Sequence, residues 1–162
     1  MARALIVGCG RRGRKLGAVL VDSGWVVRGT TRDETKLAEI EAEGIEAVLA
    51  DPDRVGTVVE QLEGVAVVVW LMGSAEAEEQ ASAVNGPRLE RMLEKLVDSP
   101  VRGFVYEAAG TVDQEVLGGG VALVAEAAAR WHIPIRTIEV EPDPIEPWLD
   151  SSSSAIEGLI AG

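Results

Sequence analysis

Three glycines near the start of the chain have the spacing of a loop that binds a diphosphate group. They are Gly8, Gly10 and Gly13, in the pattern G-x-G-x-x-G. In this pattern the first glycine lets the chain turn sharply, the second leaves room for a pyrophosphate, and the third lets the next helix pack closely on the sheet. That helix then presents its N-terminal amides and positive dipole end to the phosphates. The spacing therefore predicts a dinucleotide-binding site.

The residues after the second apolar run indicate which dinucleotide is bound. An NAD site usually has Asp or Glu about 20 residues after the glycines, where the carboxylate bonds the ribose 2′-hydroxyl. Thr30, Thr31 and Arg32 stand at this place instead. A guanidinium with two hydroxyls suits a 2′-phosphate, and Arg11 and Arg12 would add positive charge. The sequence therefore favours NADP(H) over NAD(H) as cofactor.

Other candidate ligands have an ordinary structural alternative. Asp51 either accepts a hydrogen bond from the adenine amino group or caps the following helix. Gly73 ends the fourth apolar run, where a glycine would let the cofactor approach closely. Arg32 alternatively begins a solvated loop, with Asp33 as the cap of the next helix. The predicted cofactor-binding residues are Gly8, Gly10, Arg11, Arg12, Gly13, Thr30, Thr31, Arg32, Asp51, Met72 and Gly73.

Composition and charge favour a discrete anionic ligand. The 162 residues have a net charge of −12, yet residues 1–32 hold seven basic side chains and one acidic side chain. Local positive charge on an acidic chain argues against nucleic acid as a partner. No apolar run approaches a membrane span and no signal peptide precedes the first strand, so we expect no membrane partner and a cytoplasmic location. A single cysteine, Cys9, argues against a disulfide or a cysteine metal cluster.

The rest of the chain alternates strand and helix patterns, as a parallel sheet with helical crossovers requires. Nearly continuous apolar content over 65–72 predicts a strand buried on both faces. The predicted fold is a three-layer, doubly wound α/β sheet of about six parallel strands in the order 3-2-1-4-5-6. Strands are expected at 3–8, 25–30, 46–50, 65–72, 101–108 and 134–140, and helices at 11–22, 34–43, 53–63, 76–97 and 115–131.

The last residues are predicted to lie outside this domain. The prolines within 141–148 argue against a helix or a central strand there, so the segment is expected to run along the surface. The serines at 151–154 indicate a flexible linker before a short helix at 155–161. We therefore predict a domain over 1–148, followed by a linker and a short terminal helix over 149–162.

With these elements placed, the chain resembles the atypical short-chain dehydrogenases/reductases, including their epimerase-like and NmrA-like members. The resemblance covers about residues 3–148 and rests on the glycine loop and on segments 29–32, 62–73 and 101–106. It implies a Rossmann fold with a bound nicotinamide dinucleotide. Reductases and epimerases of this superfamily use a serine near the end of the fifth strand and Tyr-x-x-x-Lys on the next helix, where the lysine lowers the tyrosine pKa.

The chain departs from this family at the catalytic positions. The expected serine position reads Glu107-Ala108-Ala109, and the tyrosine and lysine positions fall near Leu117 and Val121. No lysine occurs after residue 95. Glu107 remains as a catalytic candidate, either as a base near the nicotinamide or as a structural partner of a backbone amide. Because only a short segment follows the sixth strand, no separate substrate domain is expected.

Three functions are compatible with these observations. The favoured one is an NADP(H)-binding sensor, regulator or accessory subunit without the standard chemistry. The second is an NADP-dependent reductase or epimerase of a small molecule that uses Glu107 or substrate-assisted proton transfer. The third, a nucleotide-sensing regulator domain of an ion transporter, resembles residues 8–14, but such domains usually end the second strand with an acidic residue where Arg32 stands. Without a substrate domain Met72 and Trp148 would be exposed, so a homodimer that covers them is expected.

Overall fold

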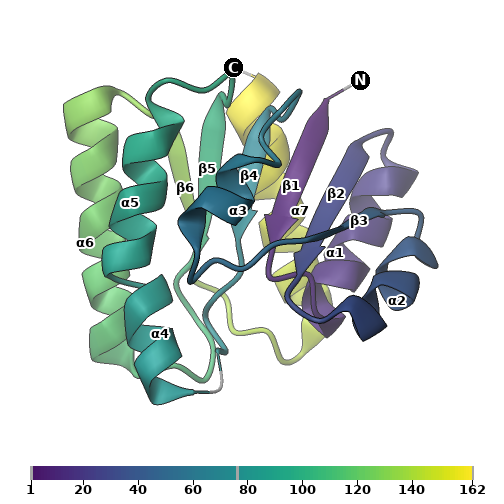
Figure 1. Cartoon of the computed structure of the whole chain (residues 1–162), viewed down its shortest axis with the longest axis horizontal. Helices are drawn as coiled ribbons and strands as arrows, with labels where there is room; N and C mark the ends of the chain where they lie inside the picture. The colour runs from purple at the N-terminus through teal and green to yellow at the C-terminus, as the bar shows by residue number, and fades with distance from the viewer. Residues whose placement is uncertain (1, 76, 162) are drawn as a thin grey trace.

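The computed structural model describes residues 2–75 and 77–161, and in this part of the chain a six-stranded parallel sheet lies between two layers of helices (Figure 1). The spatial order is β3-β2-β1-β4-β5-β6 with every neighbouring pair parallel, which confirms the predicted doubly wound fold. The strands are β1 (Arg3–Val7), β2 (Val26–Thr31), β3 (Glu46–Leu49), β4 (Val67–Trp70), β5 (Gly103–Glu107) and β6 (Ile135–Ile138). The helices are α1 (Arg11–Asp22), η1 (Glu34–Lys36), α2 (Leu37–Glu41), α3 (Val55–Val59), α4 (Glu78–Val84), α5 (Pro87–Leu96), α6 (Gln114–Trp131) and α7 (Ile145–Ala161).

Both faces of the central strands are buried, as the apolar run over 65–72 predicts. In β4, Val67 and Val69 belong to the core beneath α1, α2 and α7, whereas Val68 and Trp70 belong to the core beneath α3, α5 and α6. All four side chains are fully buried. Figure 1 shows the same division of helices between the two faces of the sheet. Burial of each such side chain contributes about 1.5–3 kcal/mol, so these strands form a stable platform for the loops at their ends.

The helix predicted at 76–97 is two helices, α4 and α5, with a break at Asn85. The Asn85 side-chain amide donates to the Met72 carbonyl, and its oxygen accepts from the Tyr106 hydroxyl at 2.7 Å. Pro87 then stands at the first position of α5, which suits proline because no intrahelical amide is needed there. The Gly86-Pro87 pair therefore indicates the start of a new helix, and the prediction of one helix over 76–97 did not take this signal into account.

Several other helices are shorter than predicted. The helix predicted at 34–43 consists of η1 and α2, and the one predicted at 53–63 is reduced to α3. Residues 1, 76 and 162, which belong to predicted segments, lie outside the described residues. The predicted helix 11–22, which follows the glycine loop, coincides with α1.

The prediction of a flexible linker at 151–154 was wrong, because these residues form the middle of α7. Pro147 stands in the first turn of the helix, where proline removes no intrahelical hydrogen bond. Trp148, Ser152 and Ile156 are buried at four-residue spacing, and Trp148 and Ile156 belong to the core shared with α1. The apolar stripe outweighs the serines, because most helix stability in proteins comes from packing. The predicted domain boundary at residue 148 therefore falls inside a helix that packs on the sheet.

The expected exposure of two large apolar side chains was also wrong. Met72 is 8% exposed because it belongs to the core beneath α3, α5 and α6, and Trp148 is fully buried because it lies on α7, which covers the other face of the sheet. The argument for a homodimer that covers these two residues therefore loses its basis, and the homodimer stays a prediction.

Proline substitution tests whether the serines at 151–154 are helical. We expect Ser153→Pro, in the middle of α7, to lower the free energy of unfolding by about 3 kcal/mol, because proline removes a hydrogen bond and clashes with the preceding turn. The control Ser153→Ala should change it by about 0.5 kcal/mol or less. Urea denaturation followed by tryptophan fluorescence measures both. Equal stability of the two variants would contradict the helix and favour a linker.

Candidate functional site

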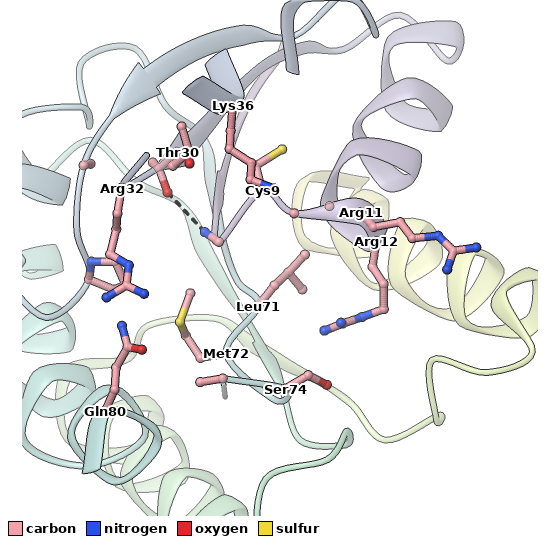
Figure 2. Close-up of a pocket in the computed structure, with 17 residues that line it drawn as sticks. Cys9, Arg11, Arg12, Thr30, Arg32, Lys36, Leu71, Met72, Ser74 and Gln80 are labelled. Atoms are coloured by element: carbon pink, nitrogen blue, oxygen red, sulfur yellow. Dashed lines mark hydrogen bonds between the residues drawn. The ribbon is translucent and has the colours of Figure 1, made fainter. Parts of the chain in front are cut away.

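A cleft of about 320 Å³ opens at the carboxyl ends of β1, β2 and β4 (Figure 2). The strand order reverses here, and ligands of doubly wound sheets bind at this switch point. The cleft is formed by the loop after β1, the end of β2 and the segment after β4. Nine of the predicted ligands line it: Gly8, Gly10, Arg11, Arg12, Gly13, Thr30, Thr31, Arg32 and Met72.

The backbone at Gly8 is packed closely against the segment after β4. Its φ is +85°, and a Cβ there would collide with the Met72 side chain and lie 2.7 Å from the Leu71 carbonyl oxygen. The Gly8 amide donates to Thr30 Oγ1 at 3.1 Å, and the Cys9 amide donates to the Thr30 carbonyl at 2.9 Å. Thr30, predicted as a nucleotide ligand, therefore holds the glycine loop against β2.

The other two glycines of the motif have different surroundings. A Cβ on Gly10 would meet nothing within 4 Å, so the backbone is open to the cleft at this point. A Cβ on Gly13 would lie 3.2 Å from the Gly8 carbonyl oxygen and 3.3 Å from Ile6 Cγ2, so α1 packs tightly against the sheet. Gly10 is also the N-cap of α1, whose first turn has neither a side-chain cap nor an acidic residue. The first amides of α1 are therefore suited to an anion.

Four basic side chains and, among the described residues, no acidic side chain line the cleft: Arg11, Arg12, Arg32 and Lys36. Arg32 extends from the end of β2 toward Gln80 on α4 (Figure 2). With its amide oxygen turned toward Arg32, Gln80 accepts hydrogen bonds from both terminal guanidinium nitrogens. Asp33 does not enter the cleft, because it caps η1 and accepts from the Thr35 hydroxyl and amide, which lower its pKa.

Lys36 and Gln80 were missed in the sequence. Lys36 lies on η1, four residues after Arg32. Because η1 begins beside the end of β2, this short separation in sequence could have identified Lys36 as a lining residue. Gln80 lies far from the glycine loop in sequence, and only the position of α4 brings it to the cleft. The remaining unpredicted lining residues are Cys9, Ala50, Pro52, Leu71, Ser74 and Ala75.

Arg12 lines the cleft, but its guanidinium is paired with Glu107. Arg12 Nη2 donates to both Glu107 carboxylate oxygens at 2.8 Å, and the guanidinium carbon lies 5.5 Å from the centre of the Trp148 ring. The Gly73 amide donates to the same carboxylate at 2.8 Å. Glu107 is fully buried, and burial raises its pKa, while the Arg12 charge and these hydrogen bonds act in the opposite direction. The candidate base is therefore held by protein donors and does not line the cleft.

Asp51 and Gly73, the other two predicted ligands, do not line the cleft. Asp51 Oδ1 accepts from the Asp53 amide at 2.9 Å, which forms a turn before α3, and the N-cap of α3 is a different residue, Arg54. A Cβ on Gly73 would collide with the Ala109 carbonyl oxygen. The glycine is therefore required by the loop after β5 rather than by a cofactor.

Comparisons with known proteins agree with this geometry. A family described as NAD(P)H-binding matches residues 8–134. Among solved structures, a short-chain dehydrogenase/reductase superfamily protein from Agrobacterium tumefaciens with bound NAD has a TM-score of 0.69 at 20% identity, over 83% of this chain and 48% of that chain. UDP-glucuronic acid 4-epimerase from Bacillus cereus in complex with NAD has a TM-score of 0.65 at 16% identity, over 87% and 60%. A short-chain dehydrogenase from Rhodopseudomonas palustris has 0.68 at 15% identity, over 96% and 90%.

These likenesses concern the fold. The chain spans 48% and 60% of the first two of these structures, so it corresponds to part of each. A search of curated protein sequences finds no match. No helix in the described part of the chain is both long enough and apolar enough to cross a membrane.

The cysteine beneath the glycine loop leads to a test of reactivity. Cys9 is 4% exposed, and burial raises the pKa of its thiol to about 12, partly opposed by the Arg14 charge. Because a raised pKa leaves less thiolate at a given pH, we expect a disulfide reagent at pH 8 to modify the native protein roughly 1,000-fold more slowly than the denatured protein. Rapid labelling of the native state would contradict this position and identify a reactive thiol.

Proposed function

The chain belongs to the NAD(P)H-binding family, and we propose that it binds NADP(H) in preference to NAD(H) and serves as a sensor, regulator or accessory subunit without the standard reductase chemistry. The observation that carries the cofactor preference is the charge of the cleft, which has four basic and no acidic side chains among its described lining residues. A carboxylate at the end of β2 would repel a 2′-phosphate. Arg32 stands there instead.

The cofactor is proposed to lie across the switch point with its diphosphate at the glycine loop. The open backbone at Gly10 and the uncapped start of α1 supply amide donors for the phosphates. The adenosine ribose then lies beside the end of β2, within the field of Arg32 and Lys36. Arg32 is partnered by the neutral amide of Gln80, so its charge is available to a phosphate. Charge-assisted hydrogen bonds of this kind contribute about 1.5–3 kcal/mol, or roughly 10- to 100-fold in affinity.

The absence of standard chemistry is proposed from the residues at the catalytic positions. Glu107, at the expected serine position, is fully buried and occupied by Arg12 and Gly73. The helix where the tyrosine and lysine are expected carries Leu117, which is buried, and Val121. A reductase that used Glu107 as its base would first have to separate it from Arg12. Arg32 also argues against the alternative of an ion-transporter regulator domain.

The cofactor preference is tested by calorimetric titration with NADPH and NADH. We expect NADPH to bind at least about 10-fold more tightly, because only NADPH offers a phosphate to Arg32. Arg32→Glu should weaken NADPH binding by roughly 100-fold and change NADH binding little. The matched control is Arg102→Glu, an equal charge change at an exposed residue just before β5, at the amino ends of the strands, whereas the cleft lies at their carboxyl ends.

Two outcomes would contradict the proposal in different ways. Equal affinity for both dinucleotides would remove the role of Arg32, and no binding of either would overturn the cofactor itself. Incubation with NADPH and carbonyl acceptors tests the second part, since we expect the NADPH absorbance to stay constant. Steady oxidation of NADPH would favour the reductase.

A further inference from the structure

A second cavity, of about 460 Å³, adjoins the cleft. It lies between α4, the loop after β5 and the start of α6, and Figure 1 shows α4 beside the start of α6. Ala75, in the segment after β4, is the one described residue that lines both the cleft and the cavity. The volume falls within the range of sites that hold small molecules. Because the proposed dinucleotide site uses none of the other lining residues, the cavity has room for a second ligand.

Part of the cavity wall is apolar. Ala81, Val112 and Leu117 form a small buried cluster of their own, beside the two main cores of the sheet. Ala75 and Val116 pack against this cluster, and all of these side chains except Leu117 line the cavity. The wall is therefore suited to the apolar part of a ligand.

Hydrogen bonds hold the loops after β4 and β5 together at this wall. The Val112 amide donates to the Gly73 carbonyl oxygen at 2.9 Å, and the Thr111 amide donates to Ser74 Oγ at 3.3 Å. Gly110 adopts a φ of +143°, and a Cβ there would collide with the Gly73 carbonyl oxygen, so the two loops are in close contact. The protein's own bonds therefore form the wall before any ligand binds, as in most small-molecule sites.

The charged side chains that line the cavity are all acidic among the described residues: Glu78 on α4, and Asp113 and Glu115 at the start of α6. Asp113 caps α6 by accepting from the Glu115 amide at 2.8 Å. Neither Glu78 nor Glu115 belongs to an ion pair in the described part of the chain. Like charges around one cavity repel one another, and a bound cation would offset this repulsion.

The sign of the lining charge changes between the two sites. On one side of Ala75 the described charged residues of the cleft are all basic, and on the other side those of the cavity are all acidic. A hollow lined by charges of one sign concentrates small ions of the opposite sign. The cleft therefore attracts an anion, whereas the cavity attracts a cation.

We propose that this cavity binds a small organic cation, namely an ammonium or guanidinium group on an apolar body. The cationic group lies between the carboxylates of Glu78 and Glu115, and the apolar body lies against Val112 and its neighbours in the wall. The hydroxyl groups of Ser82 and Thr111, which also line the cavity, can accept hydrogen bonds from the same cationic group. This ligand is additional to the dinucleotide, and its binding does not depend on the proposed function.

The proposal is tested by NMR titration of the ¹⁵N-labelled wild-type protein, without nucleotide, with three probes that share a phenyl group on a short chain. The probes are 2-phenylethylamine, a cation, 2-phenylethanol, which is neutral, and 3-phenylpropanoate, an anion. We expect the amine to bind at least about 10-fold more tightly than the other two. It should shift the amide signals of Thr111, Val112 and Val116 and leave those of Gly10 and Thr30 in the cleft unchanged.

Three results of this titration would overturn the proposal. They are equal affinity for the three probes, unchanged cavity signals at about 10 mM amine, and shifts confined to the cleft. Because no nucleotide is present, each of these results leaves the proposed NADP(H) binding untouched, and a failure of NADPH to bind leaves this site untouched.

Charge variants test the role of the carboxylates. The double variant Glu78→Gln/Glu115→Gln keeps the size of both side chains and should weaken binding of 2-phenylethylamine at least about 10-fold. The matched control Glu79→Gln/Glu126→Gln removes the same charge from the same two helices, at exposed positions that do not line the cavity, and should leave the affinity unchanged. Circular dichroism checks that each variant is folded, and the wild-type titration decides the proposal if the first variant is not. Unchanged affinity in the folded first variant, or an equal loss in the control, would overturn the proposal.

Discussion

The narrow passage of the chain at Gly8, between the ends of β2 and β4, is the constraint on which the cleft depends. A positive φ and contacts with Leu71 and Met72 leave no room for a side chain. Hydrogen bonds to Thr30 then fix the loop against β2. This passage directs the start of α1 toward the cleft and leaves the backbone at Gly10 open. The position of the anion-binding amides thus follows from the packing of one residue on two neighbouring strands.

The charge of the cleft is opposite in sign to the net charge of the molecule. The chain is strongly acidic, with a net charge of −12, yet the described lining of the cleft is basic. A positive cleft in an acidic molecule concentrates the field on a small anion and discourages long polyanions. Within the cleft the positive charge is uneven, because Glu107 neutralises Arg12, whereas Arg32 faces an uncharged amide. Arg32 and Lys36 therefore supply positive charge at the end beside β2, and Arg11 supplies it at the start of α1.

The fold and the glycine loop could be predicted because they depend on local patterns, namely apolar periodicity and glycine spacing. The pairing of Arg12 with Glu107 could not, because 95 residues separate them and the direction of each side chain depends on how α1 meets β5. Only the end of α7, residues 155–161, was predicted as helix; residues 145–154 were missed because prolines and four serines obscured the spacing of Trp148 and Ile156, and tertiary packing decides such a segment. The predicted helix is broken at Asn85 for a similar reason, because this residue is hydrogen-bonded to the segment after β4 and to β5, and sequence periodicity does not reveal these contacts.

The central claim is that the end of the cleft beside β2 binds the 2′-phosphate. An experimental structure of the complex with NADPH tests this claim most directly. We predict that the 2′-phosphate lies within hydrogen-bond distance of the Arg32 guanidinium, that the diphosphate lies against the Gly10 amide, and that the Arg12–Glu107 pair is intact. A 2′-phosphate directed into solvent away from Arg32, or a nucleotide bound elsewhere on the protein, would contradict it.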